Sequence, residues 1–322
     1  MIIACGEALI DMVSEKDPAG REIFIPCPGG SPYNTAIAIG RILGEKNGKA
    51  QAAFLSRLSR DFFGEILIQR LQQNKVSTEL SARSNQNTTL AFVKLNKEKE
   101  PEYIFYTENS SDRSLSNTDI PADLPPGTSC ILFGSISLTM ESSATTIEQF
   151  IFRERERKDG KVISLDPNVR PLMIQDRSFY VNRFEKWVSS SDIVKISSED
   201  FNFIYPGLPP LKGAEKLIAM GARFVIVTFG EDGASALFTH NGITKQIYVP
   251  AFHTAVADTI GAGDTFHGAF LSWLEINNKM SRCDITDLSE KDLQDALLFA
   301  NKAAAIVCSR EGADPPTRKE VI

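Results

Sequence analysis

The segment Ala257–Glu275, ADTIGAGDTFHGAFLSWLE, joins a glycine turn to a carboxylate and a helix. Gly261, Ala262 and Gly263 can turn tightly and expose backbone N–H groups. Apolar residues then recur at helical spacing, at Phe266, Phe270 and Leu274. Because unpaired N–H groups and the positive end of the helix dipole meet at such a turn, the segment predicts an anion-binding site.

Asp264 lies in the first turn of that helix, where a carboxylate repels a bound phosphate. Its chemical use there would be to accept a proton from an attacking hydroxyl. Phosphoryl transfer depends mostly on positioning and charge neutralisation, so a weakly basic Asp suffices, and general-base help contributes a rate factor of roughly 10²–10⁴. The plainer alternative is that Asp264 only stabilises the helix start. The length of the run DTxGAGDxFxG favours the chemical role.

A second glycine turn, in the stretch CPGGSPYN, leads into another helix. Gly29 and Gly30 let the backbone approach a ligand closely. Ser31 offers an N-cap, Pro32 occupies the first helical position, and Asn34 lies in the first turn. Taken alone, the pattern also fits a plain helix start.

Two charged residues follow predicted strands. Asp11 comes just after the first strand and could accept two hydroxyl hydrogen bonds from a sugar, although a solvent-exposed carboxylate is the plainer interpretation. Arg170 ends the stretch SLDPNVR, which follows a strand at the ligand edge of the sheet. Its guanidinium could pair with a phosphate or with the substrate.

Two later segments could contact a nucleotide. The first, VTFGEDG at 227–233, is rich in glycine and follows a strand. The second, FANKAA at 299–304, is on a C-terminal helix whose small residues and Asn301 could lie against a flat base. Close packing of helices is the alternative interpretation of this second segment.

The chain has 322 residues, a net charge of −6 and an apolar content of 42%. This length fits one large α/β domain that buries about 75% of its unfolded surface. The acidic balance argues against nucleic-acid or membrane partners, which favour basic patches. No apolar run approaches 18 residues, and the apolar N-terminus lacks a basic region, so we interpret it as a strand. Five cysteines without a CxxC pair fit free thiols in a reducing cytosol, and we expect a cytoplasmic protein.

Short apolar runs alternate with helical patterns, which predicts a parallel sheet with helices on both faces. The predicted strands are Ile2–Cys5, Ala53–Leu58, Cys130–Phe133, Val162–Leu165, Ile193–Ile196 and Phe224–Thr228. The predicted helices start at Ser31 and Asp61 and occupy Ser143–Arg157, Phe179–Ser189 and Leu211–Met220. Such a sheet binds ligands at the carboxyl ends of its strands.

Two stretches, Leu9–Pro26 and Thr89–Tyr106, depart from the alternation of strands and helices, because neither has a predicted helix beside it. The second reads as two alternating strands around a charged turn, Asn96–Glu102. We assign both, about residues 10–27 and 88–107, to a small β lid inserted in a single α/β kinase domain that spans 1–322. A surface hairpin without function is the alternative.

Other nucleotide and hydrolase motifs are missing from the sequence. No G-x-x-x-x-G-K-[ST] occurs, and Gly44–Lys49 reads GEKNGK, one residue short of it. No G-x-G-x-x-G follows the first strand, which argues against a dinucleotide oxidoreductase. No G-x-S-x-G nucleophile elbow is present either.

The chain resembles the ribokinase-like (PfkB-type) carbohydrate kinases over nearly its whole length. The signature Asp258–Gly268 matches closely, and Gly29 and Gly30 with Asn34 match the other family signature. Further stretches are similar to bacterial fructokinases: GEALIDM, LAFVKL, IFYTENSSDRSL, FGSISLTME, SLDPNVRPLMIQDR and DIVKISSEDF. The resemblance implies a three-layer α/β/α domain with a central, mainly parallel sheet and a small β lid over the sugar.

The resemblance also implies roles for individual residues. Asp264 would be the base that activates the sugar hydroxyl, and Gly261, Ala262 and Gly263 would form the anion hole. The sugar would be held by Asp11, Gly29, Gly30 and Asn34, with Arg170 reaching toward the substrate or its phosphate. The nucleotide pocket would be lined by Lys195, Thr228, Gly230, Gly233 and Asn301.

ATP would bind with Mg²⁺, which the protein would hold mostly through water and phosphate oxygens. Many relatives carry Asn-x-x-Glu after the Lys195 strand, where this chain has Ser197 and Asp200, and this departure bears on how tightly the metal is organised. A K⁺ site near the Asp258–Ile260 backbone is compatible with the family. Lids in relatives often pair between subunits, so a homodimer through the lid is also compatible.

The expected reaction is transfer of the ATP γ-phosphate to a hydroxymethyl oxygen of a furanose-like sugar, with D-fructose as the first choice. A kinase of the same fold acting on 2-keto-3-deoxygluconate, ribose or a nucleoside is the alternative, since Arg170 could serve a keto acid. A catalytically silent sugar sensor is the rival from another class. The intact Gly261–Asp264 run argues against it, because a silent protein would be free to lose Asp264.

Overall fold

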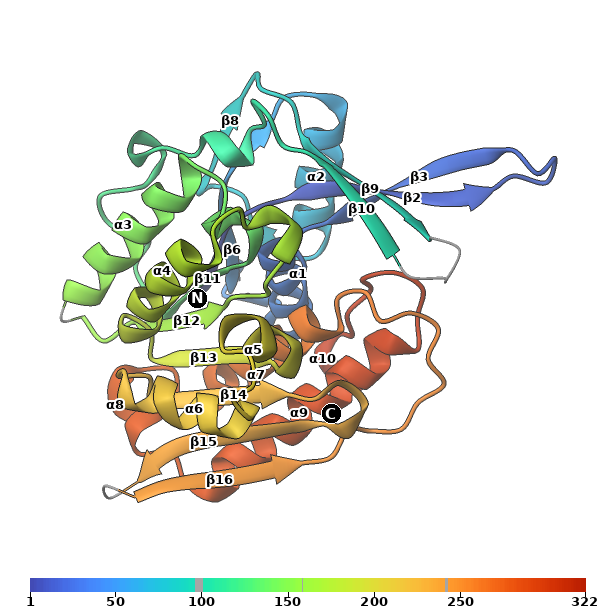
Figure 1. Ribbon diagram of the computed structural model, residues 1–322. Coiled ribbons are helices and arrows are strands. Elements are labelled where there is room, and N and C mark those ends of the chain that lie inside the picture. The colour runs from blue at the N-terminus through green and yellow to red at the C-terminus, as the bar shows by residue number, and fades with distance from the viewer. Residues whose placement is uncertain (96–100, 158, 241–242) are drawn as a thin grey trace.

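The centre of the protein is a large, mostly parallel sheet (Figure 1). In this computed structural model, which describes residues 1–95, 101–157, 159–240 and 243–322, the strand order is β16-β15-β14-β13-β12-β11-β1-β6-β7, with β8 paired to β6. The strands are β1 (Ile2–Cys5), β6 (Ala52–Ser59), β7 (Val76–Ser77), β8 (Ser81–Ser84), β11 (Cys130–Gly134), β12 (Val162–Asp166), β13 (Ile193–Ser197), β14 (Phe224–Thr228), β15 (Ala234–His240) and β16 (Ile243–Val249). The predicted parallel sheet is confirmed, but the antiparallel pair β15 and β16 at its edge was not predicted.

Helices cover both faces of this sheet, as the alternation of strands and helices predicted (Figure 1). One face is covered by α1 (Ser31–Leu43), α2 (Phe62–Gln73), α7 (Ala262–Ile276), α8 (Arg282–Thr286), α9 (Glu290–Cys308) and α10 (Arg318–Val321). The other is covered by α3 (Ser143–Glu156), α4 (Arg177–Ser189), α5 (Ser198–Ile204) and α6 (Pro210–Ala219). Short 3-10 turns complete the chain: η1 (Asp112–Ser114), η2 (Asn117–Asp119), η3 (Ser135–Leu138), η4 (Pro171–Met173) and η5 (Gly230–Asp232).

Successive residues of each strand point to opposite faces, so the sheet separates two hydrophobic cores. In β1, Ile2 and Ala4 pack into the core shared with α1, α7 and α9, whereas Ile3 and Cys5 pack into the core under α3, α4 and α6. Both faces of the strand are therefore apolar, which is why the parallel strands read as short unbroken apolar runs. Within the described residues, no helix has the length and apolar character needed to cross a membrane.

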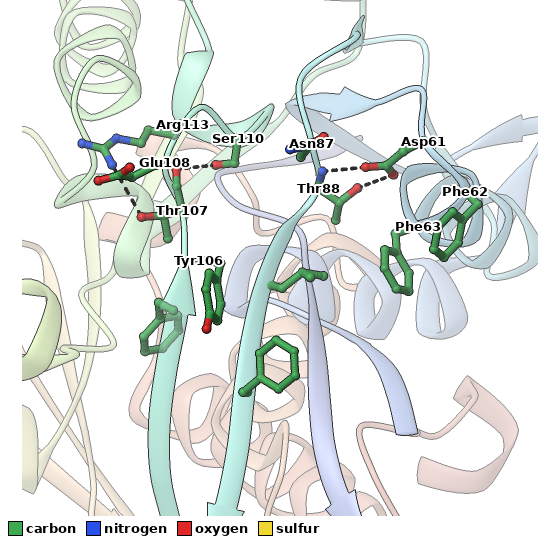
Figure 2. A pocket seen from close by; sticks show the side chains of 13 residues that line it. Asp61, Phe62, Phe63, Asn87, Thr88, Tyr106, Thr107, Glu108, Ser110 and Arg113 are labelled. Carbon is green, nitrogen blue, oxygen red and sulfur yellow. Dashed lines mark hydrogen bonds between the residues drawn. The ribbon is translucent and has the colours of Figure 1, made fainter. Parts of the chain in front are cut away.

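A second sheet of four strands, in the order β10-β9-β2-β3, projects from the carboxyl side of the central sheet (Figure 1). Its strands are β2 (Leu9–Lys16), β3 (Glu22–Gly29), β9 (Thr89–Leu95) and β10 (Pro101–Tyr106). This sheet contains both stretches assigned to the lid, while most of the expected charged turn, residues 96–100, lies outside the described residues. A cavity of about 860 Å³ lies between this sheet and the start of α2 (Figure 2). A separate hairpin, β4 (Glu45–Lys46) and β5 (Lys49–Ala50), contains the GEKNGK stretch.

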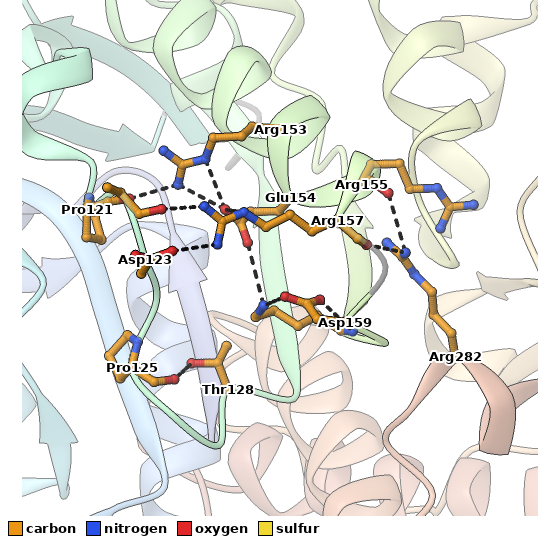
Figure 3. Close-up of polar contacts among 12 residues, drawn as sticks. Pro121, Asp123, Pro125, Thr128, Arg153, Glu154, Arg155, Arg157, Asp159 and Arg282 are labelled. Atoms are coloured by element: carbon orange, nitrogen blue, oxygen red, sulfur yellow. Dashed lines mark hydrogen bonds and ion pairs between the residues drawn. The ribbon is translucent and has the colours of Figure 1, made fainter.

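Two buried carboxylates organise the arginine-rich end of α3. Asp192, which is fully buried before β13, accepts from Arg155 at 2.6 Å, Arg282 at 3.2 Å and Arg223 at 3.4 Å. Figure 3 shows Arg282, whose guanidinium donates to the backbone carbonyl of Arg155 near the end of α3. The same figure shows the second buried carboxylate and the side chains that pair with it. That carboxylate is Glu154, which is fully buried and pairs with Arg153, Arg157 and Lys161. Asp192 thus links Arg155 of α3 to Arg282 of α8 and to Arg223 at the start of β14.

We expect Asp192→Asn to destabilise the protein because it leaves three arginines facing an uncharged group. Breaking a buried ion pair by removing one partner costs about 3–5 kcal/mol, and because these arginines are partly exposed we expect about 2–4 kcal/mol. Urea denaturation followed by circular dichroism measures this loss. Asp123→Asn is the matched control, since Asp123 pairs with Arg157 at 3.0 Å but is 88% exposed, and it should cost about 0–1 kcal/mol. Equal losses in the two variants would contradict this account.

Candidate active site

The anion turn predicted at Gly261, Ala262 and Gly263 forms the N-terminus of α7. Gly261 is the N-cap in the left-handed conformation, with φ of 74° and ψ of 6°, and α7 begins at Ala262. A Cβ on Gly261 would lie 2.9 Å from the Cβ of Ala313, so the turn needs glycine for space as well as for conformation. Asp258 holds the segment that precedes the turn, because its carboxylate accepts from the backbone N–H groups of Ile260 and Gly312, each at 3.0 Å.

Asp264, in the first turn of α7, is joined to the start of α1 by two hydrogen bonds. Its Oδ1 accepts from Ser31 Oγ at 2.6 Å, and its Oδ2 accepts from Asn34 Nδ2 at 3.0 Å. The side chain is buried, and burial raises the pKa of the Asp264 carboxyl while the hydrogen bonds from Ser31 and Asn34 oppose this rise. The carboxylate therefore gains basicity from burial and keeps a fixed orientation.

The structure corrects the predicted cap of α1. Gly30, not Ser31, is the N-cap residue, and no side chain caps this helix. Gly30 has φ of 105°, and a Cβ there would lie 2.8 Å from the carbonyl oxygen of Glu7. Ser31 is the first helical residue instead, so its hydroxyl is available to donate to Asp264. The serine recognised as a cap signal is therefore part of the site.

Asp11 and Arg170, both predicted to contact the sugar, interact electrostatically with each other. Asp11 is on β2, paired with Cys27 of β3 and Ala91 of β9. A Cβ on Gly29 would lie 2.1 Å from Asp11 Oδ2, so the glycine makes room for the carboxylate. Burial raises the pKa of Asp11 to about 6, while the Arg170 guanidinium lowers it and the Asp264 carboxylate raises it further. Asp11, Arg170 and Asp264 are therefore close enough to interact electrostatically.

A buried polar cluster lies beside the anion turn. Lys195 Nζ donates to Asp166 Oδ2 at 2.9 Å, and a Cβ on Gly263 would lie 3.0 Å from the same Nζ. Burial alone would raise the pKa of the Asp166 carboxyl, but Lys195 and His267 outweigh it and lower this pKa to about 2. Burial alone would lower the pKa of Lys195, but Asp166 outweighs it and raises that pKa. Asp166 and Lys195 thus form a stable ion pair next to the turn.

The remaining residues predicted for the nucleotide lie around the end of β14. Thr228 ends β14, Gly230 has φ of 58° in η5, and Gly233 has φ of 103°. A Cβ on Gly233 would lie 2.3 Å from the carbonyl oxygen of Val249, so close approach of backbones explains this glycine. Asn301 on α9 donates from Nδ2 to the carbonyl oxygens of Pro250 at 3.0 Å and Val249 at 3.3 Å. Its amide thus holds the chain that leads from β16 toward the anion turn.

Ser197 and Asp200 form a capping box at the start of α5. Ser197 Oγ accepts from the backbone N–H of Asp200 at 3.0 Å, and Asp200 Oδ1 accepts from that of Val169 at 2.9 Å. Asp200 therefore fixes the segment that carries Arg170. Across the described parts of the chain, no group of three or more His, Cys, Asp or Glu side chains could hold a metal ion.

Sequence reasoning missed Glu7, which supports the whole site. Glu7 is buried in the connection between β1 and β2, and its carboxylate accepts from the backbone N–H groups of Ser31 and Ser137, each at 3.2 Å. Burial raises the pKa of Glu7 to about 7. An acidic residue inside the apolar stretch ACGEALI was the available signal, because a carboxylate in such a run is either surface-exposed or hydrogen-bonded. His267, inside the apolar stretch of α7, carried the same kind of signal.

We expect Ser31→Ala to raise the pKa of Asp264 further, because the hydroxyl stabilises the ionised carboxylate. A base must be ionised to act, so the acidic limb of activity should move to higher pH with it. Carboxyl carbon NMR titration of Asp264 measures the change directly. Thr35→Ala is the matched control, since Thr35 Oγ1 donates at 2.9 Å to the carbonyl oxygen of Ser31 within the same helix and not to Asp264. A titration midpoint equal to that of the unaltered protein in Ser31→Ala would contradict the assigned hydrogen bond.

Comparisons with known proteins agree with this geometry. A fructokinase from Rhizobium leguminosarum bv. trifolii is 36% identical over 301 residues, which cover 91% of this chain and 86% of that protein. The probable fructokinase-5 of Arabidopsis thaliana is 32% identical over 329 residues, which cover 98% of this chain and 93% of that protein.

Solved structures are similar as well. The fructokinase from Xylella fastidiosa with bound ATP superposes with a TM-score of 0.86 at 25% identity, covering 99% of this chain and 96% of that one. A fructokinase double mutant from Vibrio cholerae O395 in a fructose-, ADP- and potassium-bound form gives a TM-score of 0.81 at 25% identity, covering 99% and 94%. The model of the pfkB family carbohydrate kinases matches residues 8–320, almost the entire chain, and the chain therefore belongs to that family.

Proposed function

We propose that this carbohydrate kinase transfers the γ-phosphate of ATP to a hydroxymethyl oxygen of D-fructose. The observation that carries the proposal is the position of Asp264, whose buried carboxylate lies at the anion turn and is hydrogen-bonded to the start of α1. The fructokinases that resemble the chain over nearly its full length favour fructose among the possible sugars. The ATP-bound and the fructose- and ADP-bound relatives favour the same pair of substrates.

In the proposed reaction, Asp264 accepts the proton of the sugar hydroxyl as its oxygen bonds to the γ-phosphorus. The bond between that phosphorus and the bridging oxygen of ADP breaks, and ADP leaves with its electron pair. The N–H groups of Gly261, Ala262 and Gly263 stabilise the charge on the phosphoryl oxygens. Mg²⁺ carried by the ATP phosphates supplies further charge neutralisation.

Both substrates would be held by groups at the carboxyl ends of the strands. Asp11 would accept hydrogen bonds from two sugar hydroxyls, at a position where Gly29 and Gly30 let the sugar approach the backbone. Asn34 would orient both the sugar and Asp264. Arg170, exposed at the mouth of the site, would reach the substrate or its phosphate. ATP would lie on the opposite side, along Thr228, Gly230, Gly233 and the α9 helix that carries Asn301.

We expect Asp264→Asn to lower kcat by roughly 10²–10⁴, because the variant keeps the shape of the side chain but cannot accept the proton. ATP affinity, measured by calorimetry, should change little. A coupled ADP-release assay with fructose, ribose, a nucleoside and 2-keto-3-deoxygluconate measures turnover and ranks the substrates. Asp287→Asn, an exposed acidic residue after α8, is the control and should leave kcat unchanged.

Near-normal turnover by Asp264→Asn would exclude this residue as the base. A higher kcat/KM for another sugar than for fructose would replace fructose with that substrate. Fructose binding without ADP release from the unaltered protein would support a silent sugar sensor.

The lid carries an exposed aromatic face that a second copy of the chain could cover. Side chains alternate between the two faces along each strand. Ala91 pairs with Asp11, so the next residue, Phe92, points to the face opposite the proposed sugar side. Its ring contacts those of Phe24 at 5.1 Å and Tyr106 at 5.5 Å between centroids. Across the cavity lies Phe62 of α2, which is 70% exposed (Figure 2). An exposed apolar surface of this kind favours association, and we propose a homodimer through the lid.

We expect Tyr106→Glu to weaken this dimer at least tenfold, about 1.4 kcal/mol, by placing a charge in the aromatic face. Sedimentation velocity over a concentration series measures the monomer fraction. Phe179→Glu is the matched control, because Phe179 on α4 is 60% exposed and Tyr106 is 61% exposed. A protein that is monomeric at every concentration, or one that both variants dissociate equally, would contradict pairing through the lid.

A further inference from the structure

We propose that Lys195 is a catalytic residue whose ammonium contacts the transferred phosphoryl group at the anion turn, and that His267 is a positioning residue that acts through Asp166. The inference rests on the proposed kinase function and adds to it a fixed cation and the means of holding it. It moves Lys195 from the lining of the nucleotide pocket, where the family resemblance placed it, to the point of phosphoryl transfer.

The first observation is the position of the Lys195 ammonium. Lys195 is near the carboxyl end of β13, its side chain is only 6% exposed, and its Nζ would lie 3.0 Å from a Cβ on Gly263. Because Gly263 has no side chain, that residue leaves the ammonium open toward the first turn of α7. An ammonium has three N–H donors, and the ion pair with Asp166 uses one of them.

The second observation is electrostatic. A helix N-terminus carries roughly half a positive charge, so a buried ammonium beside it adds to a positive potential. Two positive groups in a buried site repel each other, and such an arrangement is favourable only with an anion present. The carboxylates of Asp166, Asp200 and Asp264 all act on Lys195 and supply that compensation. Because Asp264 would repel a phosphoryl group at the turn, the ammonium would also offset this repulsion. In a poorly solvated site, a cation fixed in advance stabilises a developing negative charge strongly.

The third observation is the way Asp166 is held. Its Oδ2 accepts from Lys195 Nζ at 2.9 Å, and His267 Nδ1 faces the same oxygen at 3.6 Å, which is too long for a hydrogen bond. Within the described residues, neither His267 Nδ1 nor the Oδ1 of Asp166 has a hydrogen-bond partner. The two contacts at Oδ2 therefore set the orientation of this carboxylate. Since the ammonium is oriented by the same oxygen, a change at His267 is transmitted to Lys195.

His267 is itself fixed in one arrangement. It is fully buried on α7, three residues after Asp264, and its Nε2 lies 2.8 Å from Ser164 Oγ. Burial lowers the pKa of His267, so the ring is neutral near pH 7. The Ser164 hydroxyl can donate to Nε2 or accept from it, so this contact fits either tautomer. In the tautomer with the proton on Nδ1, that N–H faces Asp166. The base and the positioning residue thus share one helix.

The test measures kcat and fructose affinity separately. Lys195→Met keeps the length of the side chain without its charge, and we expect kcat to fall by roughly 10²–10³ while the fructose Kd from calorimetry stays within about twofold. The double variant Lys195→Met with Asp166→Asn removes both charges of the buried pair. Because Asp166 then carries no charge, the double variant avoids the destabilisation that an unpaired buried carboxylate would cause. It should show the same loss of kcat as Lys195→Met.

His267 is tested by a pair of variants. His267→Leu removes the ring nitrogen that faces Asp166 at 3.6 Å, and we expect kcat to fall about tenfold with fructose Kd unchanged, because the ring no longer acts electrostatically on the carboxylate that orients Lys195. His267→Asn places an amide N–H where Nδ1 lies and should restore kcat to within about threefold. A merely structural role would instead lower the thermal midpoint of both variants without separating their kcat values.

The outcomes separate this inference from the proposed function. Absence of sugar-dependent ADP release from the unaltered protein would remove the kinase function itself. Normal turnover by the unaltered protein together with near-normal kcat in the Lys195→Met double variant would overturn the role of Lys195 alone. Equal kcat in His267→Leu and His267→Asn would overturn the role of His267.

Discussion

The hydrogen bonds between the Asp264 carboxylate and the start of α1 are the interaction on which the site depends. Two helices begin at this point, and their positive ends would repel each other without an anion between them. Asp264 supplies that anion, accepting from Ser31 and Asn34. The same carboxylate is the proposed base next to the predicted anion turn. One group therefore holds the two helices together and carries the proposed chemistry.

The support of this junction extends into the rest of the molecule. Glu7 holds the backbone of Ser31 and of the η3 turn, so the connection between β1 and β2 is linked to the start of α1. Asp258 holds the anion turn against Gly312. Both carboxylates accept backbone N–H groups at tight turns, where the chain has no other internal partner for them. The rigidity of the site comes from acceptors placed at the turns.

The lid adds a second constraint, because its two faces have different chemistry. Asp11 lies on the face proposed to bind the sugar, and Gly29 leaves space for its carboxylate. The adjacent residues of the same strands form the aromatic face around Phe92. Since a β-strand alternates its side chains, one short sheet can present a polar surface to a substrate and an apolar surface to a partner. Substrate binding and association can thus be linked through the same four strands.

The sequence by itself determined the local features. Glycines with a following apolar periodicity defined the anion turn and α7, and unbroken apolar runs defined the parallel strands. Turns, caps and periodicities depend on residues a few positions apart, so they can be read along the chain. The antiparallel strand β16 was missed because its exposed positions dilute the apolar signal. The strand β15 was missed because its buried positions include Ala234, Ser235 and Ala236, which give only a weak apolar signal.

Only the tertiary structure decided which polar side chains meet. Ser31 and Asp264 are 233 residues apart, and Ser164 and His267 are 103 residues apart. Hydrogen bonds of this kind depend on how helices pack over the sheet, and nothing in the spacing of the residues specifies the pairing. For that reason Ser31 was taken for a helix cap, and the cluster of Asp166, Lys195 and His267 became visible only in the folded protein. Local chemistry marked where an anion could bind, and packing decided which groups surround it.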